Sequence, residues 1–286
     1  CDKGGEAMPS TYAHYTFGER MLLLFPAKIR ALIQENRALY DIGLHGPDIL
    51  FYYKALCSNE VNAVGYEMHD KPGADFFAPA KEIWQQFRTD GASCAQHTAY
   101  LLGFLCHYAL DQCCHGYVEK MMAVSGLSHA EIETEFDRFL LLQAGKDPLR
   151  AHLTQHIHPT RDRARVIADF FPTLTTEQIF QALCSMIRYH KLLRTPGTLK
   201  RSFLLGILKI SGNYADMHGL LMRKNSNPAC QLSNNGLSRR LGQALHECQS
   251  LTQEYLDCLE KNTPLSTHFM PTFGAGDSWQ HISLES

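Results

Sequence analysis

The sequence lacks the features of a membrane-spanning protein, a nucleic-acid scaffold or a disulfide-stapled domain. Its 286 residues contain no apolar run of about eighteen or more, so no transmembrane helix is predicted. Lys and Arg total 27 against 29 Asp and Glu, and no basic tract stands out, so long nucleic acids are not expected as partners. The ten cysteines form no CxxC pair, which argues against a zinc ribbon or a disulfide framework.

Most cysteines lie in apolar stretches, where they are typical small buried side chains, and this favours a reduced, cytosolic location. No secretory signal is recognisable. We expect Met8 to be the natural start, with residues 1–7 a foreign remnant or a disordered N-terminus. A mature lipoprotein beginning at Cys1, or another secreted form, is the alternative.

The alternating pattern of β-strands is also missing, and no internal repeat replaces it. Apolar residues recur at helical spacing, which predicts a single all-α domain of roughly ten helices over residues 8–261. The expected helices cover residues 12–25, 27–40, 74–89, 92–122, 129–142, 149–156, 161–170, 176–193, 198–222 and 235–260. We expect a loop over residues 57–74 and an extended C-terminal tail over residues 262–286.

Histidine, in contrast, is abundant, with fifteen residues. His107, Asp111 and His115 recur at four-residue spacing in an apolar segment, so one helix face carries two imidazoles and a carboxylate. A buried carboxylate is costly unless it is paired or metal-bound. The two histidines lie about 12 Å apart along the axis, too far to share one ion easily, so Asp111 would bridge two ions. A His–Asp hydrogen bond in the core is the alternative.

His129 and Glu133 repeat this spacing at the start of the next helix, where Ser128 and Glu131 form the pattern of a capping box. Acidic residues are common in the first turns of helices. The competing interpretation of this segment, with its Glu131, Glu133, Glu135 and Asp137, is therefore a solvated acidic face.

Three other residues are weak signals when taken singly. His14 lies in the first helix, Asp48 follows Gly46 and Pro47 at a helix start, and His69 lies in the expected loop. Asp at a helix start is ordinarily a capping residue, and a lone histidine is ordinarily a core or surface residue.

Taken in order, these residues resemble the ligands of the bacterial zinc-dependent phospholipase C family and its relatives, the S1/P1-type nucleases. Those enzymes are all-helical and hold three zinc ions in one cleft. Their ligands are a histidine in the first helix, an aspartate in a helix-start turn, a loop histidine, HxxxD on a long helix and HxxxE on the next. The matching residues are His14, Asp48, His69, His107, Asp111, His129 and Glu133, within a resemblance that covers roughly residues 8–140.

The resemblance implies two or three zinc ions per chain. It assigns Asp48, His69, His107 and Asp111 to one ion, His129 and Glu133 to a second, and His14 to a third, with Asp111 bridging. The family has a further histidine six residues after the aspartate, where this chain has Tyr117, so His115 is the natural substitute. In secreted members the amine of the first mature residue completes the third site, and Met8 lies closer to His14 than that spacing.

The resemblance also implies phospholipase C-like cleavage of a phospholipid or a related phosphodiester by zinc-activated water. Asp48 is the expected catalytic residue, because it would be both a ligand and a neighbour of the attacking water. Phe51 and Tyr52 are expected to line the apolar part of the cleft, with core packing as the alternative. The rival functions are a nuclease or nucleotidase on the same scaffold and a non-catalytic zinc-binding helical protein. Nothing in the sequence specifies an oligomeric state.

Overall fold

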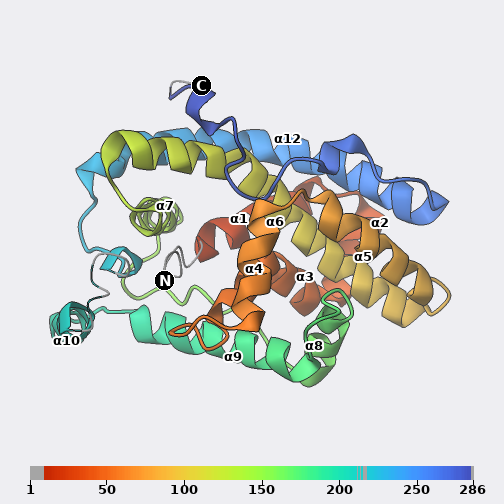
Figure 1. Cartoon of the computed structure of the whole chain (residues 1–286), viewed down its shortest axis with the longest axis horizontal. Coiled ribbons are helices and arrows are strands. Elements are labelled where there is room, and N and C mark those ends of the chain that lie inside the picture. Colours follow the sequence, from red (N-terminus) through yellow and green to blue (C-terminus); the bar gives the residue numbers. More distant parts are fainter. Residues whose placement is uncertain (1–9, 211, 213, 215–217, 285–286) are drawn as a thin grey trace.

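Helices surround one long central helix, α6, in the computed structural model, which describes residues 10–210, 212, 214 and 218–284 (Figure 1). The α-helices are α1 (Thr11–Leu24), α2 (Ala27–Glu35), α3 (Arg37–Gly43), α4 (Glu60–Asp70), α5 (Ala74–Phe87), α6 (Gly91–Ser125), α7 (His129–Gln143), α8 (Arg161–Ala168), α9 (Thr176–Leu193), α10 (Thr198–Ile210) and α12 (Gln231–Lys261). The short 3₁₀ helices are η1 (Gly46–Tyr52), η2 (His218–Leu220), η3 (Pro228–Cys230), η4 (Thr267–Phe269) and η5 (Trp279–His281). These ranges contain no strand, and the all-α prediction is confirmed.

α6 is long because its sequence contains an N-terminal capping residue, a C-terminal glycine and an apolar stretch between them. The Asp90 side chain accepts hydrogen bonds from the first backbone N–H groups of the helix. Gly126 ends the helix with a φ of 70°, which glycine adopts without a steric penalty. Every residue from 97 to 111 is buried, since α3, α12 and their neighbours enclose this stretch. The polar side chains within it are therefore buried too.

α3 and α6 cross with their backbones in direct contact. A Cβ atom on Gly103 would lie 2.2 Å from the carbonyl oxygen of Tyr40, and one on Gly43 would lie 2.4 Å from that of Tyr100. Because the obstacles are backbone atoms, which cannot move aside, only glycine permits this approach. The crossing brings η1, which follows α3, against His107 of α6.

The prediction of a loop over residues 57–74 is wrong for the central part of this segment, which forms α4. The Asn59 side chain accepts hydrogen bonds from the backbone N–H groups of Val61 and Asn62, and the Asn62 side chain accepts one from the Asn59 N–H. This is a capping box built from two asparagines instead of Ser or Thr with Glu, so its sequence pattern was not recognised. His69 consequently lies in the last turn of a helix and not in a loop.

Three other expected helices differ from the structure. The helix over residues 27–40 is interrupted at Asn36, whose side-chain amide donates a hydrogen bond to a backbone carbonyl of the preceding turn. Residues 149–156 form turns and no helix. Of the helix expected over residues 198–222, α10 covers residues 198–210, and Gly212 has a φ of 77°, which a continuing helix does not allow. Residues 211, 213 and 215–217 of this prediction lie outside the described residues.

The segment after α12, expected to be an extended tail, packs back onto the helices in its described part, residues 262–284. The side chains of Phe269 and Phe273 are buried in the main core. The backbone N–H of Gly274 donates a hydrogen bond to the carbonyl of His69 over 2.9 Å. The C-terminal segment therefore lies against the end of α4.

No helix among the described residues has the length and apolarity needed to cross a membrane. The cysteines of the described ranges are all free thiols. Cys106 and Cys248 come closest to one another, with Sγ atoms 3.8 Å apart in the core and no bond between them. This agrees with the expectation that the cysteines form no disulfide framework.

Candidate metal centre

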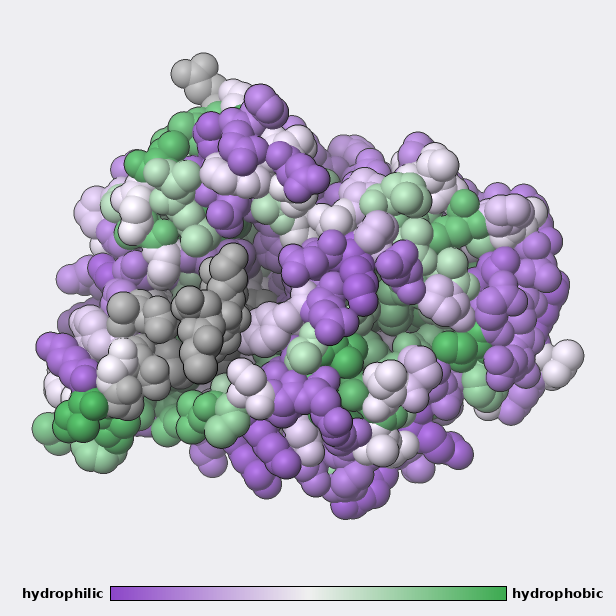
Figure 2. All heavy atoms as spheres, in the orientation of Figure 1, coloured by the Kyte–Doolittle hydropathy of each residue, from purple (hydrophilic) through white to green (hydrophobic). Residues whose placement is uncertain are grey.

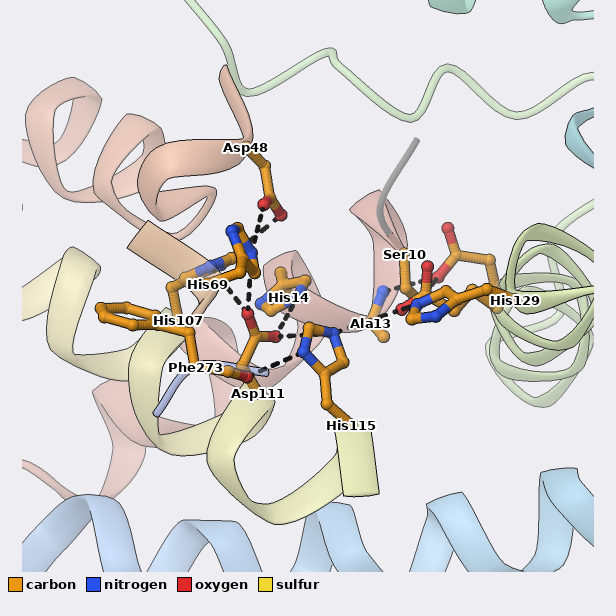
Figure 3. A network of polar contacts seen from close by, with 12 residues as sticks. Ser10, Ala13, His14, Asp48, His69, His107, Asp111, His115, His129 and Phe273 are labelled. Carbon is orange, nitrogen blue, oxygen red and sulfur yellow. Dashed lines mark hydrogen bonds and ion pairs between the residues drawn. The ribbon is translucent and has the colours of Figure 1, made fainter. Parts of the chain in front are cut away.

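Asp111 lies at the centre of a group of imidazoles that come from α1, α4 and α6 (Figure 3). Its Oδ1 atom is 3.2 Å from Nε2 of His14 and 3.7 Å from Nε2 of His115. Its Oδ2 atom is 2.9 Å from Nε2 of His107 and 3.7 Å from Nε2 of His69. The two carboxylate oxygens thus face different pairs of histidines, as expected of a carboxylate that bridges two ions.

Two further carboxylates close the ends of this cluster. Asp48 of η1 places Oδ1 3.1 Å from Nε2 of His69. Glu133 of α7 places Oε1 3.1 Å from Nε2 of His129 and 3.8 Å from Nε2 of His115. Ligand atoms lie within 4.8 Å of one another in three groups: His14, His107 and Asp111; Asp48, His69 and His107; His115, His129 and Glu133. All eight residues expected as ligands therefore lie together.

Backbone carbonyls fix the orientation of two of the imidazoles. Nδ1 of His69 lies 2.8 Å from the carbonyl oxygen of Gly65, and Nδ1 of His115 lies 2.8 Å from that of Phe273. A carbonyl only accepts, so each Nδ1 carries the hydrogen. In the neutral form of each ring, Nε2 then carries the lone pair and points into the cluster, which is the arrangement of histidine ligands in metal sites.

The cluster holds three buried carboxylates and no fixed positive charge. Among the described residues, every ion pair formed by Asp48, Asp111 or Glu133 is with a histidine. Burial disfavours a charged imidazole, but the adjacent Asp48 carboxylate outweighs it and raises the pKa of His69 to about 9. Burial also opposes the ionisation of Asp111, yet the surrounding histidines hold its pKa well below its usual range. The site therefore favours bound positive charge.

Poor hydrogen bonding within the cluster distinguishes it from an ordinary polar core. Asp111 Oδ2 and His107 Nε2 are 2.9 Å apart, yet within the described part of the chain neither has a partner in hydrogen-bond geometry. Buried polar atoms are normally satisfied. Donors around tetrahedral zinc, with bonds of about 2.0–2.2 Å, are separated by about 3.4 Å. The contacts of 2.9–3.8 Å surround that value, so the residues fit zinc better than they fit one another.

The start of α7 places the two expected ligands, His129 and Glu133, where the sequence predicts. Ser128 and Glu131 form the capping box, and His129 is the first residue of the helix. The alternative of a solvated acidic face is wrong, because the Glu133, Glu135 and Asp137 of this helix are all buried.

Asp137 is the supporting residue that the sequence analysis missed. Its carboxylate accepts hydrogen bonds from the backbone N–H groups of Tyr12 and Ala13, at 2.9 and 2.8 Å, and from the Ser10 hydroxyl at 2.6 Å. It therefore caps the first turn of α1, which carries His14. Its position four residues after Glu133, on the same face of α7, was the signal that could have identified it.

We expect the Asp137→Ala substitution to destabilise the protein and weaken the metal group that contains His14. Two backbone donors of α1 lose their buried acceptor, a loss of about 2–4 kcal/mol in the free energy of unfolding. Urea unfolding and zinc content measure the two effects. Asp257→Ala is the control, since this exposed carboxylate contacts only the neighbouring surface side chains Gln253 and Lys261 among the described residues, and it should change neither value. Equal unfolding free energies for Asp137→Ala and the unaltered protein would contradict the capping role.

In α6, the histidine expected at position 117 is replaced by Tyr117, and His115 is its substitute. The directions of these two side chains explain the difference. Tyr117, where the family has its histidine, points away from the cluster: its hydroxyl donates to the carbonyl of Leu232 in α12, and its ring packs against Gly236. His115 instead faces Glu133. Although the histidine lies at position 115 and not at position 117, an imidazole therefore still lies beside α7.

The two aromatic residues expected in the substrate cleft occupy different environments. Phe51 lies at the edge of the cluster, with its ring centroid 5.4 Å from that of His69. Tyr52 is fully buried, and its hydroxyl lies 2.9 Å from Nε2 of His190. Tyr52 is therefore a core residue, which agrees with the packing alternative, and only Phe51 lies beside the cluster.

Comparison with known proteins agrees with this geometry. A model of the zinc-dependent phospholipase C family matches residues 13–185. The match spans all eight clustered residues: His14, Asp48, His69, His107, Asp111, His115, His129 and Glu133. No curated protein and no solved structure matches the chain.

Proposed function

Because the chain belongs to the zinc-dependent phospholipase C family, we propose that the cluster around Asp111 binds two or three zinc ions and hydrolyses a phospholipid or a related phosphodiester. One observation carries this proposal. Three buried carboxylates converge with five imidazoles, each carboxylate has an oxygen without a hydrogen-bond partner, and all their ion pairs within the described ranges are with histidines. Such a group of residues is costly to fold unless cations occupy it.

The donor groups favour two ion positions with at least three donor residues each, and a third position with fewer donors. Asp48, His69, His107 and Asp111 would hold one ion, and His115, His129 and Glu133 a second. Of the eight clustered residues, His14 alone is left for a third ion, beside Asp111, so that position needs further ligands.

Zinc, when bound, supplies a coordinated water with a pKa near about 7 and neutralises the phosphate oxygens. The residues of the chain orient and deprotonate that water. We assign the proton acceptor to Asp48, because its carboxylate lies at one end of the cluster beside the Nε2 atom of His69. The water oxygen would form the new bond to phosphorus while its proton passes to Asp48. The bond from phosphorus to the alcohol oxygen would break, and that oxygen would take the same proton back from Asp48.

Hydrolysis of a soluble chromogenic phosphocholine ester tests the proposal. We expect turnover by the zinc-loaded protein, loss of turnover on chelation, and no hydrolysis of single-stranded DNA. Cleavage of DNA or nucleotides but not of the ester would favour the nuclease alternative. Bound zinc without turnover of any phosphodiester would identify a non-catalytic zinc-binding protein.

The Asp48→Asn substitution tests the assigned role. We expect kcat to fall by about 10²–10⁴-fold, because the amide cannot accept the proton. Zinc at the group formed by His115, His129 and Glu133 should remain. Asp169→Asn is the matched control: this carboxylate also pairs with a histidine, His97, at 2.9 Å, but no donor group of the cluster contains it. Unaltered kcat in Asp48→Asn would exclude it as the proton acceptor.

A further inference from the structure

α10 presents an apolar stripe to solvent. None of its residues is buried. The exposed apolar residues are Leu199, Phe203, Ile207 and Ile210, which are 88%, 68%, 46% and 91% exposed. At 100° per residue these four positions fall within about 80° of the helix circumference, so they form one continuous face. The green area at the lower left of Figure 2 is the corresponding region of the surface.

The same region concentrates positive charge. Residues 188–210 contain six basic residues and no acidic residue, although the whole chain has a formal net charge of −2. The basic residues are Arg188, Lys191, Arg194, Lys200, Arg201 and Lys209. Lys200 and Lys209 are exposed within α10 itself, where they flank the apolar stripe. The Lys200 ammonium group donates hydrogen bonds to the backbone carbonyls of Lys191 and Arg194, at 3.0 and 2.9 Å, so it lies close to these two basic residues.

α10 is held in place through its ends and not through its apolar face. The Arg201 guanidinium donates hydrogen bonds to the carbonyls of Met222 and Leu221, at 2.7 and 3.2 Å. The preceding helix, α9, packs against η1, which carries Asp48. The following element, η2, packs against α7, which carries His129. Both flanks of α10 thus rest on elements of the metal centre, while the stripe faces outward.

We propose that α10 binds the surface of an anionic lipid membrane, with its apolar stripe inserted between the headgroups and its lysines at the phosphate level. A helix of thirteen residues is about 20 Å long, which is too short to cross a bilayer core of about 30 Å. Apolar residues on one face and flanking lysines are typical of helices that lie flat in the interface. The inference does not depend on catalysis, because the helix would bind lipid whether or not the metal centre hydrolyses it.

Charge favours a lipid surface over a second copy of the chain. Two α10 stripes packed together would bring the flanking Lys200 and Lys209 of one copy close to those of the other, and like charges in an interface oppose association. Anionic headgroups instead attract each lysine. The stripe and its basic border thus complement a surface that is apolar inside and negative outside.

Vesicle sedimentation tests the inference, with phosphatidylcholine vesicles that do or do not contain phosphatidylglycerol. We expect the Leu199→Ser/Phe203→Ser/Ile210→Ser variant to bind the anionic vesicles at least about tenfold more weakly than the unaltered protein. Leu23→Ser/Leu56→Ser is the matched control, because these leucines are 75% and 72% exposed elsewhere. It should bind as the unaltered protein does.

The charge contribution is tested with Lys200→Glu/Lys209→Glu. Its binding should fall at least about tenfold on phosphatidylglycerol-containing vesicles and change little on phosphatidylcholine alone. Equal binding by the serine variant and the unaltered protein would overturn the inference. A self-association that the serine substitutions abolish, without vesicle binding, would also overturn it and identify a second copy as the occupant.

Turnover of the soluble phosphocholine ester, measured on the same proteins, separates this inference from the proposed function. The α10 variants should hydrolyse the ester at the unaltered rate. If the unaltered protein hydrolyses no ester while the α10 variants still bind vesicles more weakly than it does, this result would support the role of α10 and reject the hydrolase.

Discussion

Replacement of Asp111 by asparagine is expected to remove zinc and hydrolytic activity together. Both oxygens of the carboxylate face imidazoles, two on each side. An amide offers one neutral oxygen, and its NH₂ group cannot bind a cation, so the bridge between two ion positions is lost. Removal of residues that only support a ligand already costs about 10–100-fold in metal affinity or activity, so loss of a bridging ligand should cost more than about 100-fold.

Zinc per chain and turnover of the phosphocholine ester measure this effect, and Asp41→Asn provides the matched control. Asp41 is also a buried aspartate, on the neighbouring helix α3, but it pairs with Arg37. Burial raises the pKa of Asp41 to about 6, so a neutral amide suits its surroundings. The control should retain zinc and activity. A full complement of zinc in Asp111→Asn would show that the carboxylate does not bridge.

The Gly46→Ala substitution is expected to disable the metal centre without altering any ligand. The added Cβ atom would lie 2.2 Å from Cδ2 of His107, which is fully buried and cannot move away. Gly46 also has a φ of 45°, which alanine adopts only with strain. His107 contributes to two of the three donor groups, so its displacement affects both. We expect a loss of about 2–5 kcal/mol in unfolding free energy, from overpacking and backbone strain together.

Gly145→Ala separates backbone strain from the clash with His107. Gly145 has a φ of 68°, but a Cβ atom there would meet nothing within 4 Å. This control should lose only the strain contribution, about 1–2 kcal/mol, and should bind zinc normally. Urea unfolding and zinc content of both variants give the comparison. Normal zinc binding by Gly46→Ala would mean that His107 can shift without leaving the ions.

Ligands within one helix were predictable because helical geometry is fixed. The four-residue spacing of His107, Asp111 and His115 defines a common face as soon as the segment is helical, and the structure has them there. His129 and Glu133 follow from the same rule. The capping box at Ser128 fixed where that helix begins, so even its register was predictable.

Contacts between distant segments were not predictable from local patterns. The Asp137 cap on α1 joins residues 125 and 124 positions apart, and no spacing rule reaches that far. The hydrogen bond that orients His115 comes from a backbone carbonyl 158 residues later, which any residue type could supply. The order of His14, Asp48 and His69 suggested a shared site only through family resemblance, and the fold was needed to show their contacts.

The family resemblance also limited what could be foreseen. It covers roughly the first half of the chain, and the family match ends at residue 185. α10 and the C-terminal segment both follow that point. Periodicity predicted a helix beginning at residue 198, but the local pattern did not show that its apolar side chains would lie exposed, as they do in the structure.

The hydrogen bond from His115 to Phe273 has a consequence for the order in which the molecule matures. The last of the eight clustered residues, Glu133, precedes Phe273 by 140 positions. During synthesis, all eight clustered residues therefore leave the ribosome well before Phe273 can orient the ring of His115 and before Gly274 can bond to the end of α4. If zinc binds as proposed, the site reaches its final geometry only after the segment around residues 273–274 has packed against α4 and α6.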